Sequence, residues 1–281
     1  MQLSFSKMHG LGNDFVVIDT INQALDLGPE QVRYLADRHL GIGCDQLLLI
    51  ESPASDEVDF NYRIFNADGG EVAQCGNGAR CFARYVRNHG LTDKDHIRVS
   101  TSAGVLECRL LPDNLVCVDM GQAHFAPADI PLDMTGLETD AQAGSYRATL
   151  AGQTVEFYAV SMGNPHAVIQ VDDLKTAPVS ELAPALQSQG IFPQGVNVGF
   201  MQITGRDRVR LRVYERGSGE TRACGSGACA AMVAGRQAGL LNDMVEVELT
   251  GGTLIIEWAG QDNTVLMTGP AIEVFSGNIE I

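Results

Sequence analysis

Apolar positions along the chain predict two well-marked helices, one in each half. They fall at 79, 82, 83 and 86, and again at 228, 231, 232 and 235, which is the spacing of a buried helical face. The second helix is apolar nearly all round, a pattern typical of a helix enclosed by a sheet. Gly90 and Gly239 follow the two helices at the position of a left-handed C-terminal cap.

Short apolar and β-branched runs bounded by turn residues predict the strands around these helices. A Gly-Asn turn leads into a strand at 11–18, and another leads into a strand at 162–169. Strand pairs are expected at 97–111 and 245–258, with turns at 101–104 and 250–252. Many short strands therefore surround one helix in each half.

The two halves are repeats of one another. Cys75-Gly76-Asn77-Gly78-Ala79 matches Cys224-Gly225-Ser226-Gly227-Ala228 at an offset of 149, without gaps. The 11–18 block matches the 162–169 block at an offset of 151, so each repeat is about 150 residues long. The expected domains are 1–122 and 123–269, with a polar connection at 127–144. Residues 270–281 have no counterpart in the repeat scheme, and one interpretation returns them to the first domain.

Composition limits the kind of protein this is. The 281 residues are 45% hydrophobic and 19% charged, as in ordinary soluble domains. A net charge of -16, with 19 basic against 35 acidic residues, argues against a nucleic-acid partner and favours a small-molecule substrate. No leader pattern and no apolar run of about 18 residues is evident, so we expect a cytoplasmic protein without a membrane partner. The seven cysteines form no C-x-x-C pair, so we expect reduced thiols and no metal site.

Cys75 and Cys224 are the candidate catalytic residues. A thiol at the first turn of a helix feels the positive end of the helix dipole, which can lower its pKa to about 3.5–7.5. The neighbouring glycines leave backbone N–H groups open to a carboxylate. Two such thiols acting on opposite faces of an α-carbon would invert an amino acid, and the helix N-termini would stabilise the charge that develops on its carboxylate. The other five cysteines, by contrast, are expected to be small core residues: Cys44, Cys81, Cys108, Cys117 and Cys229.

Five blocks of sequence closely resemble the diaminopimelate epimerase family, and the resemblance covers essentially the whole chain. They are His9-Gly10-Leu11-Gly12-Asn13-Asp14-Phe15, Phe65-Asn66-Ala67-Asp68-Gly69-Gly70, Gln74-Cys75-Gly76-Asn77-Gly78-Ala79-Arg80-Cys81, Gly163-Asn164-Pro165-His166 and Glu215-Arg216-Gly217-Ser218-Gly219-Glu220-Thr221-Arg222-Ala223-Cys224-Gly225-Ser226-Gly227. Bacterial relatives often carry a cysteine where this chain has Ala167; this departure alters no expected role.

The resemblance implies an α/β (α+β) fold of two pseudo-repeated domains, each a curled, mostly antiparallel sheet around a central helix. It also implies an isomerase that interconverts LL- and meso-diaminopimelate in lysine and peptidoglycan biosynthesis without a cofactor, with a homodimer as the family expectation. Cys75 and Cys224 would be the acid–base pair. The substrate-binding positions it implies are Asn13, Gln46, Asn66, Gly76, Asn77, Asn164, Asn197, Glu215, Arg216, Gly225 and Ser226.

Some of these residues also have purely structural interpretations. Arg216 offers a planar fork to a second carboxylate, although a lone arginine is more often a solvated surface charge. Asn13 and Asn164 suit turns. His166 is either a structural imidazole bonded to a strand carbonyl or a group that supports the site.

Other functions fit the sequence less well. A pyridoxal-phosphate racemase needs a Schiff-base lysine, and Lys7, Lys94 and Lys175 all lack a neighbouring phosphate loop. The glycines at 10–12 and 41–43 do not complete a dinucleotide fingerprint. A proline racemase would also use two cysteines but needs no second carboxylate site, and an isomerase lacking the thiol pair is a further rival. A non-catalytic amino acid binding protein would bind without exchanging the α-proton.

Overall fold

The computed structural model describes residues 2–25, 27–140 and 144–281, which form four helices and 19 strands within those ranges. The chain divides into two compact units. Unit 1 consists of residues 1–119 and 268–281, and unit 2 consists of residues 120–267. No helix in the described part of the chain is long and apolar enough to cross a membrane.

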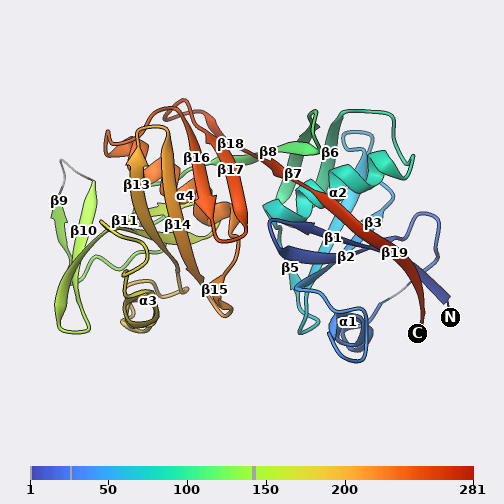
Figure 1. Cartoon of the computed structure of the whole chain (residues 1–281), viewed down its shortest axis with the longest axis horizontal. Coiled ribbons are helices and arrows are strands. Elements are labelled where there is room, and N and C mark those ends of the chain that lie inside the picture. The colour runs from blue at the N-terminus through green and yellow to red at the C-terminus, as the bar shows by residue number, and fades with distance from the viewer. Residues whose placement is uncertain (1, 26, 141–143) are drawn as a thin grey trace. The chain divides into compact units, whose positions relative to one another are not determined.

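Unit 1 contains the N-terminal strands, two helices and the C-terminal strand (Figure 1). Its elements in chain order are β1 (Gln2–Gly10), β2 (Asn13–Asp19), α1 (Pro29–Ala36), β3 (Gln46–Glu51), β4 (Phe60–Asn66), β5 (Glu71–Val72), α2 (Gly76–Asn88), β6 (His96–Thr101), β7 (Gly104–Leu110), β8 (Leu115–Gln122) and β19 (Ile272–Glu280). The last residues of β8 belong to unit 2.

Unit 2 follows a similar plan. Its elements are β9 (Glu138–Asp140), β10 (Ser145–Leu150), β11 (Gln153–Ser161), β12 (Pro165–Gln170), α3 (Val179–Ser188), β13 (Asn197–Gly205), β14 (Arg208–Glu215), β15 (Gly219–Thr221), α4 (Gly225–Gln237), β16 (Met244–Leu249), β17 (Gly252–Glu257) and β18 (Thr264–Pro270). The last residues of β18 belong to unit 1.

The strand pairing is the same in both units. In unit 1, β2 pairs with β3 in parallel, β4 is antiparallel to β3 and β5, β4 is parallel to β6, and β6 is antiparallel to β7. In unit 2 the same succession links β12, β13, β14, β15, β16 and β17. Most pairs are antiparallel, as the family resemblance implied. At the end of the chain, β19 pairs antiparallel with β1.

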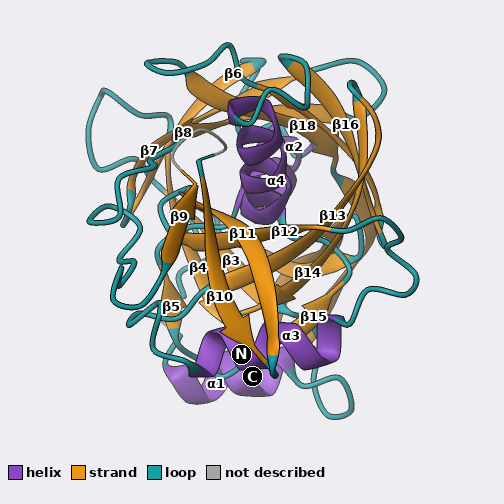
Figure 2. Ribbon diagram, turned by 90° about the vertical axis from the view of Figure 1, so that its left-hand side faces the viewer, coloured by secondary structure: helices purple, strands orange, loops and turns teal. Residues whose placement is uncertain are grey.

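One helix in each unit packs inside its sheet. Helix α2 contacts β1, β2, β3, β7 and β19, and α4 contacts β11, β12, β13, β14, β16 and β17. Figure 2 shows α4 enclosed by the strands of its unit. The eight predicted core positions are all buried, so the prediction from their spacing is confirmed. Gly90 and Gly239 have φ of 71° and 75°, and the amide following each donates back into its helix, which confirms the two C-terminal caps.

Each unit also contains a shorter helix that the sequence analysis did not predict. Helix α1 buries Val32, Leu35 and Ala36, which join a core cluster with Leu47 and Phe65. Helix α3 contains a proline in its interior, Pro184, yet it buries an apolar side in the core of unit 2. The expectation that strands surround one helix in each half is confirmed, and α1 and α3 are additional helices.

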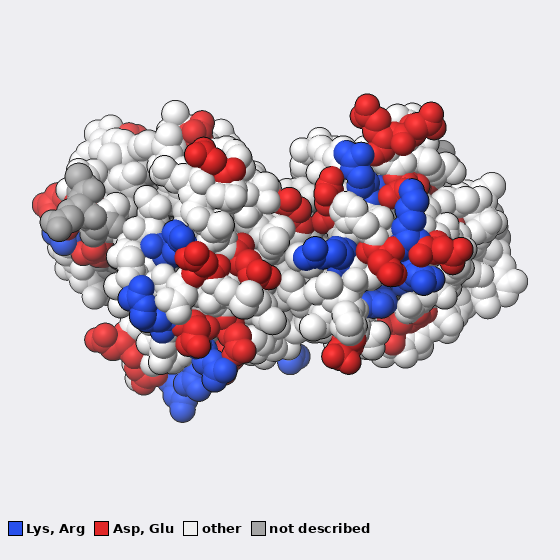
Figure 3. Space-filling model, turned by 90° about the horizontal axis from the view of Figure 1, so that it is seen from above, with Lys and Arg blue, Asp and Glu red and all other residues white. Residues whose placement is uncertain are grey.

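One ion pair occurs twice and ties together the strands that precede each cysteine. Arg63 binds Glu71 through two hydrogen bonds of 2.9 Å, joining β4 to β5. Arg212 binds Glu220 through two bonds of 2.6 and 2.8 Å, joining β14 to β15. On the face seen in Figure 3, basic side chains likewise lie beside acidic ones. Such two-point pairs fix geometry as well as charge, so each unit holds its cysteine-bearing turn in the same way.

Candidate active site

Cys75 and Cys224 occupy matching positions at the start of the two enclosed helices. Each is the N-cap residue, with φ and ψ of -147° and 117° for Cys75 and -122° and 109° for Cys224. Their carbonyl oxygens accept the first helical hydrogen bonds, from Ala79 at 2.8 Å and Ala228 at 3.0 Å. The first amides of a helix have no partner within the helix, so they point toward the region of the thiol.

In unit 1, the thiol lies beside Asn13, which in turn bonds Asn77. The Cys75 sulfur is 3.9 Å from the Asn13 Oδ1 atom, which also accepts a hydrogen bond of 3.1 Å from the Asn77 amide. Asn13 is the first residue of β2, directly after Gly12, whose φ is 84°. The left-handed turn at Gly12 thus brings the Asn13 side chain to the helix N-terminus.

The other two predicted residues of unit 1 contact each other on neighbouring strands. The Gln46 amide donates to the Asn66 Oδ1 atom at 2.9 Å, and the two residues face each other across the antiparallel pair of β3 and β4. Gln46 also pairs with Phe15, two residues beyond Asn13. These side chains therefore lie at neighbouring strand ends, while Gly76 and Asn77 form the first turn of α2.

In unit 2, Cys224 is more deeply buried than Cys75. Cys224 is 4% exposed, whereas Cys75 is half-buried. The Cys224 sulfur lies 3.7 Å from the Ser226 hydroxyl, accepts the Gly227 amide and hydrogen-bonds the Glu215 carboxylate. Gly225 and Ser226 begin α4, as Gly76 and Asn77 begin α2.

The remaining predicted residues of unit 2 form a second group. His166 is 1% exposed, and its Nε2 atom is 3.0 Å from Asn164 Oδ1. His166 pairs with Asn197 across the parallel strands β12 and β13, and Asn197 Oδ1 accepts the backbone N–H of Arg216 at 2.8 Å. The Arg216 guanidinium donates to the Gln194 carbonyl.

Burial sets the protonation states in unit 2. Desolvation raises the pKa of Cys224 well above its usual value, and the nearby Glu215 charge raises it further. The expectation that the helix N-terminus would lower the pKa of this thiol was therefore wrong, because burial and a carboxylate outweigh the amide and hydroxyl contacts. Desolvation, aided by the Arg216 charge, lowers the pKa of His166 to about 3. Around neutral pH, Cys224 is a thiol and His166 is uncharged.

The five other cysteines are all buried, as the sequence predicted. Burial raises the pKa of Cys44, Cys81 and Cys108 to about 12, so these thiols stay protonated near neutral pH.

Sequence reasoning missed several residues that hold the site. The Tyr62 hydroxyl donates to the Cys75 carbonyl at 3.3 Å, and the Thr221 hydroxyl donates to Glu215 at 2.5 Å. Asp45 accepts the Asn13 amide at 3.0 Å. Tyr62 and Thr221 carried no signal, because neither lies in an unusual pattern. Asp45 did carry one, since it directly precedes Gln46 and follows the glycines at 41–43.

Comparison with known proteins identifies the family to which the chain belongs. The family model for diaminopimelate epimerase matches residues 5–126 and 158–274. The chain is 57% identical to the diaminopimelate epimerase of Thioalkalivibrio sulfidiphilus and 56% identical to that of Chromobacterium violaceum, and each alignment covers 100% of both chains.

The fold also matches solved structures of low sequence identity. The crystal structure of a hydroxyproline epimerase from Agrobacterium vitis, with bound trans-4-hydroxy-L-proline, superposes with a TM-score of 0.70 over 99% of this chain and 92% of the other, at 14% identity. At that identity the likeness concerns the fold alone. The family match and the full-length relatives show that the chain is an isomerase of the diaminopimelate epimerase family.

Proposed function

We propose that this protein epimerises LL-diaminopimelate to meso-diaminopimelate without a cofactor, using Cys75 and Cys224 as a pair of acid–base groups. Membership of the family supports the substrate and the reaction. The observation that carries the mechanism is the matched position of the two cysteines, each the N-cap residue of an enclosed helix in one repeat. Nothing in ordinary packing requires a thiol at both places.

The proposed reaction balances with the two thiols alone. One cysteine, as a thiolate, removes the α-proton, so that a C–H bond breaks and an S–H bond forms. The electron pair moves onto the carboxylate, where helix N-terminal amides stabilise the developing charge. The other cysteine, as a thiol, gives its proton to the opposite face of the carbon, and its S–H bond breaks. The stereocentre is inverted, and the two sulfurs have exchanged protonation states.

The polar residues near each cysteine are proposed to hold the two ends of the substrate. At the reacting end, Gly76, Asn77, Gly225 and Ser226 would offer backbone amides to the carboxylate. At the distal end, Arg216 would bind the second carboxylate through its guanidinium. Asparagine and glutamine amides both donate and accept, which suits a zwitterionic ligand: the residues in this role are Asn13, Gln46, Asn66, Asn164 and Asn197, with Glu215 as an acceptor. The two domains at 1–122 and 123–269 would each supply one thiol.

Proton NMR in D2O tests the proposed reaction directly. LL-diaminopimelate is incubated with the pure protein without any added cofactor, and the α-proton signal is followed. We expect loss of that signal together with appearance of the meso isomer. Binding without exchange would instead identify an amino acid binding protein, and exchange that needs added pyridoxal phosphate would contradict the cofactor-free mechanism.

Cysteine variants test the assignment of the two thiols. Positioned acid–base groups contribute about 10²–10⁴-fold to a rate, so Cys75→Ala or Cys224→Ala should reduce turnover by at least about a hundredfold. Cys81→Ala and Cys229→Ala are matched controls, because each removes a buried thiol from the same helix and should leave turnover within about threefold, the scale of a small packing defect. Near-normal turnover by Cys75→Ala would contradict the two-thiol mechanism.

A further inference from the structure

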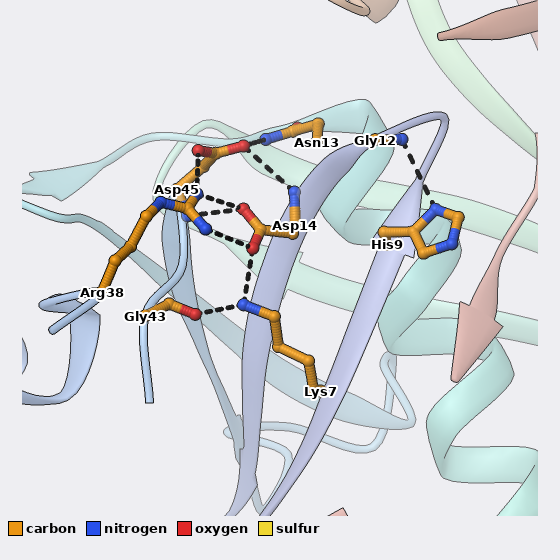
Figure 4. Close-up of polar contacts among 8 residues, drawn as sticks. All are labelled: Lys7, His9, Gly12, Asn13, Asp14, Arg38, Gly43 and Asp45. Atoms are coloured by element: carbon orange, nitrogen blue, oxygen red, sulfur yellow. Dashed lines mark hydrogen bonds and ion pairs between the residues drawn. The ribbon is translucent and has the colours of Figure 1, made fainter. Parts of the chain in front are cut away.

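A cluster of four charged side chains lies beside Asn13 on the far side from Cys75. Figure 4 shows Lys7, Asp14, Arg38 and Asp45 joined in one network, with Asn13 at its edge. The Asp14 carboxylate accepts from Lys7 at 2.5 Å and from two Arg38 nitrogens at 2.7 and 3.0 Å. Arg38 also donates to Asp45 Oδ1 at 2.7 Å.

Asp45 connects this cluster to Asn13. Its second oxygen, Oδ2, accepts the Asn13 side-chain amide at 3.0 Å and the Asp14 backbone N–H at 3.1 Å. Arg38 and the Asp14 amide are donors only, so they hold the Asp45 carboxylate in the orientation that receives Asn13. The ion pairs with Lys7 and Arg38 lower the pKa of Asp14 despite its partial burial, so it keeps its charge in the working pH range.

The direction of these hydrogen bonds determines which end of Asn13 faces the thiol. An asparagine side chain has a donor end and an acceptor end, and so does its neighbour Asn77; both could turn over together and still bond each other. An ionised carboxylate only accepts. Asp45 therefore holds the Asn13 nitrogen on its own side, which leaves Oδ1 to face Asn77 and the Cys75 sulfur.

We propose that Asp45 is a positioning residue that fixes the Asn13 amide with its oxygen toward Cys75, so that the thiol form of Cys75 is bonded and its thiolate is opposed. This inference rests on the proposed function of Cys75 as an acid–base group. Asp45 does not touch the sulfur, and it acts only through Asn13.

Two titratable side chains near Cys75 are uncharged around neutral pH. Tyr62 on β4 and Cys81 on α2 interact electrostatically with Cys75, and burial raises the pKa of both. Lys7, Asp14, Arg38 and Asp45 all lie beyond Asn13. Asn13 connects the charged cluster to the thiol. A substitution at Asp45 can therefore change the orientation of the Asn13 amide beside the sulfur.

The test measures alkylation of Cys75 by iodoacetamide as a function of pH, with each cysteine resolved by peptide mass spectrometry. In Asp45→Ala, the Asn13 amide is free to turn its NH₂ group toward the sulfur, which favours the thiolate. We expect the midpoint of the Cys75 profile to move to lower pH by about one unit, the scale of one hydrogen bond to a charged group. Asp45→Asn keeps an acceptor in place and should shift the midpoint less.

Two further measurements separate positioning from loss of stability. Asp59→Ala is the matched control, because Asp59 also accepts a backbone N–H and binds a cation, at 2.8 and 2.6 Å, but lies away from Asn13. It should leave the Cys75 profile and the turnover unchanged. In a double-variant cycle, Asp45→Ala should change kcat/KM by about tenfold in the native background, because it shifts the protonation equilibrium of Cys75 by about one pH unit, and by much less in an Asn13→Ala background.

The outcomes distinguish this inference from the proposed function. An unchanged Cys75 profile in Asp45→Ala, additive effects of the two substitutions, or an equal shift in Asp59→Ala would each overturn the positioning role. Failure of the native protein to exchange the α-proton would overturn the proposed function instead, because alkylation of Cys75 does not depend on turnover.

Discussion

Replacing Gly78 by alanine tests how closely helix α2 must approach strand β4 to hold Cys75. A Cβ atom at position 78 would lie 2.4 Å from the Tyr62 hydroxyl, about 1 Å inside the 3.4 Å of an ordinary contact. The Tyr62 ring is 2% exposed and packs edge-on against Phe82 with centroids 5.1 Å apart, so it has no free space to move into. The clash must displace either the ring or the start of the helix.

Two opposing effects decide whether this substitution raises or lowers the free energy of unfolding. Alanine in place of glycine within a helix is worth about 1 kcal/mol in favour of folding. Overpacking a buried site costs about 1–3 kcal/mol. We expect Gly78→Ala to lower the free energy of unfolding by up to about 2 kcal/mol, and to reduce turnover because the Tyr62 hydroxyl bonds the Cys75 carbonyl.

Tyr62→Phe provides the matched control for this clash. Removing the hydroxyl makes room for the new methyl group, and the Cys75 carbonyl keeps its bond from the Ala79 amide. The next contacts of the added Cβ atom, at 3.3 Å to Leu48 and 3.4 Å to Ile64, are tolerable. Gly78→Ala should therefore be neutral or stabilising in the Tyr62→Phe background.

Urea unfolding measures the effect in the unit where it should arise. Circular dichroism follows both units, whereas fluorescence of Trp258, the one tryptophan of the sequence, reports on unit 2. The destabilisation should appear in circular dichroism and leave the fluorescence transition nearly unchanged. An equal loss of stability with and without the Tyr62 hydroxyl would refute the packing argument, since it would mean that the two sites are not coupled.

Three further predictions follow from the groups around the two thiols. Lysine lacks the distal carboxylate that Arg216 is proposed to bind, so its racemisation, followed by α-proton exchange, should be about 10⁴-fold slower than that of diaminopimelate; comparable rates would indicate a broader racemase. The pKa of His166 is about 3 in the folded protein against about 6.5 unfolded, so the unfolded state binds more protons between these values and stability should fall as pH drops from about 6.5 to 3. In urea titrations, His166→Gln should lose stability less steeply over that window, and an unchanged slope would contradict the burial argument. Glu215→Gln removes a charge that raises the pKa of Cys224, so alkylation of Cys224 should begin at lower pH, whereas no change would assign the raised pKa to burial alone.

The repeated elements could be predicted because their signals are local. The spacing of the apolar residues located both enclosed helices, and Gly90 and Gly239 marked their ends because the chain there needs a positive φ. Helices α1 and α3 gave weaker signals. Helix α1 has only eight residues, and α3 contains Pro184, which lacks the N–H of a regular helix and argues locally against one. Their apolar sides are stabilised by packing on a sheet that is distant in the sequence.

Long-range contacts account for what the sequence did not reveal. Arg80 lies on the enclosed helix with 0% exposure, although a charged residue is normally expected at a surface. Its Nε atom donates to the Pro270 carbonyl, 190 residues away in the chain. The burial of Cys224 also depends on contacts between distant parts of the sequence. The glycine pattern predicted that Cys224 directly precedes a helix. Its burial and its contact with Glu215, however, depend on how β14 packs beside α4.

The two half-sites share a backbone and differ in what faces the sulfur. Cys75 has a neutral amide oxygen beside it, and Cys224 has a carboxylate. A full negative charge opposes a thiolate more strongly than an amide dipole does. The two repeats thus have equivalent helix N-termini, whereas residues from the neighbouring strands make the two thiols unequal. In the proposed two-thiol mechanism, that inequality would give a reason for one sulfur to begin as the base and the other as the acid.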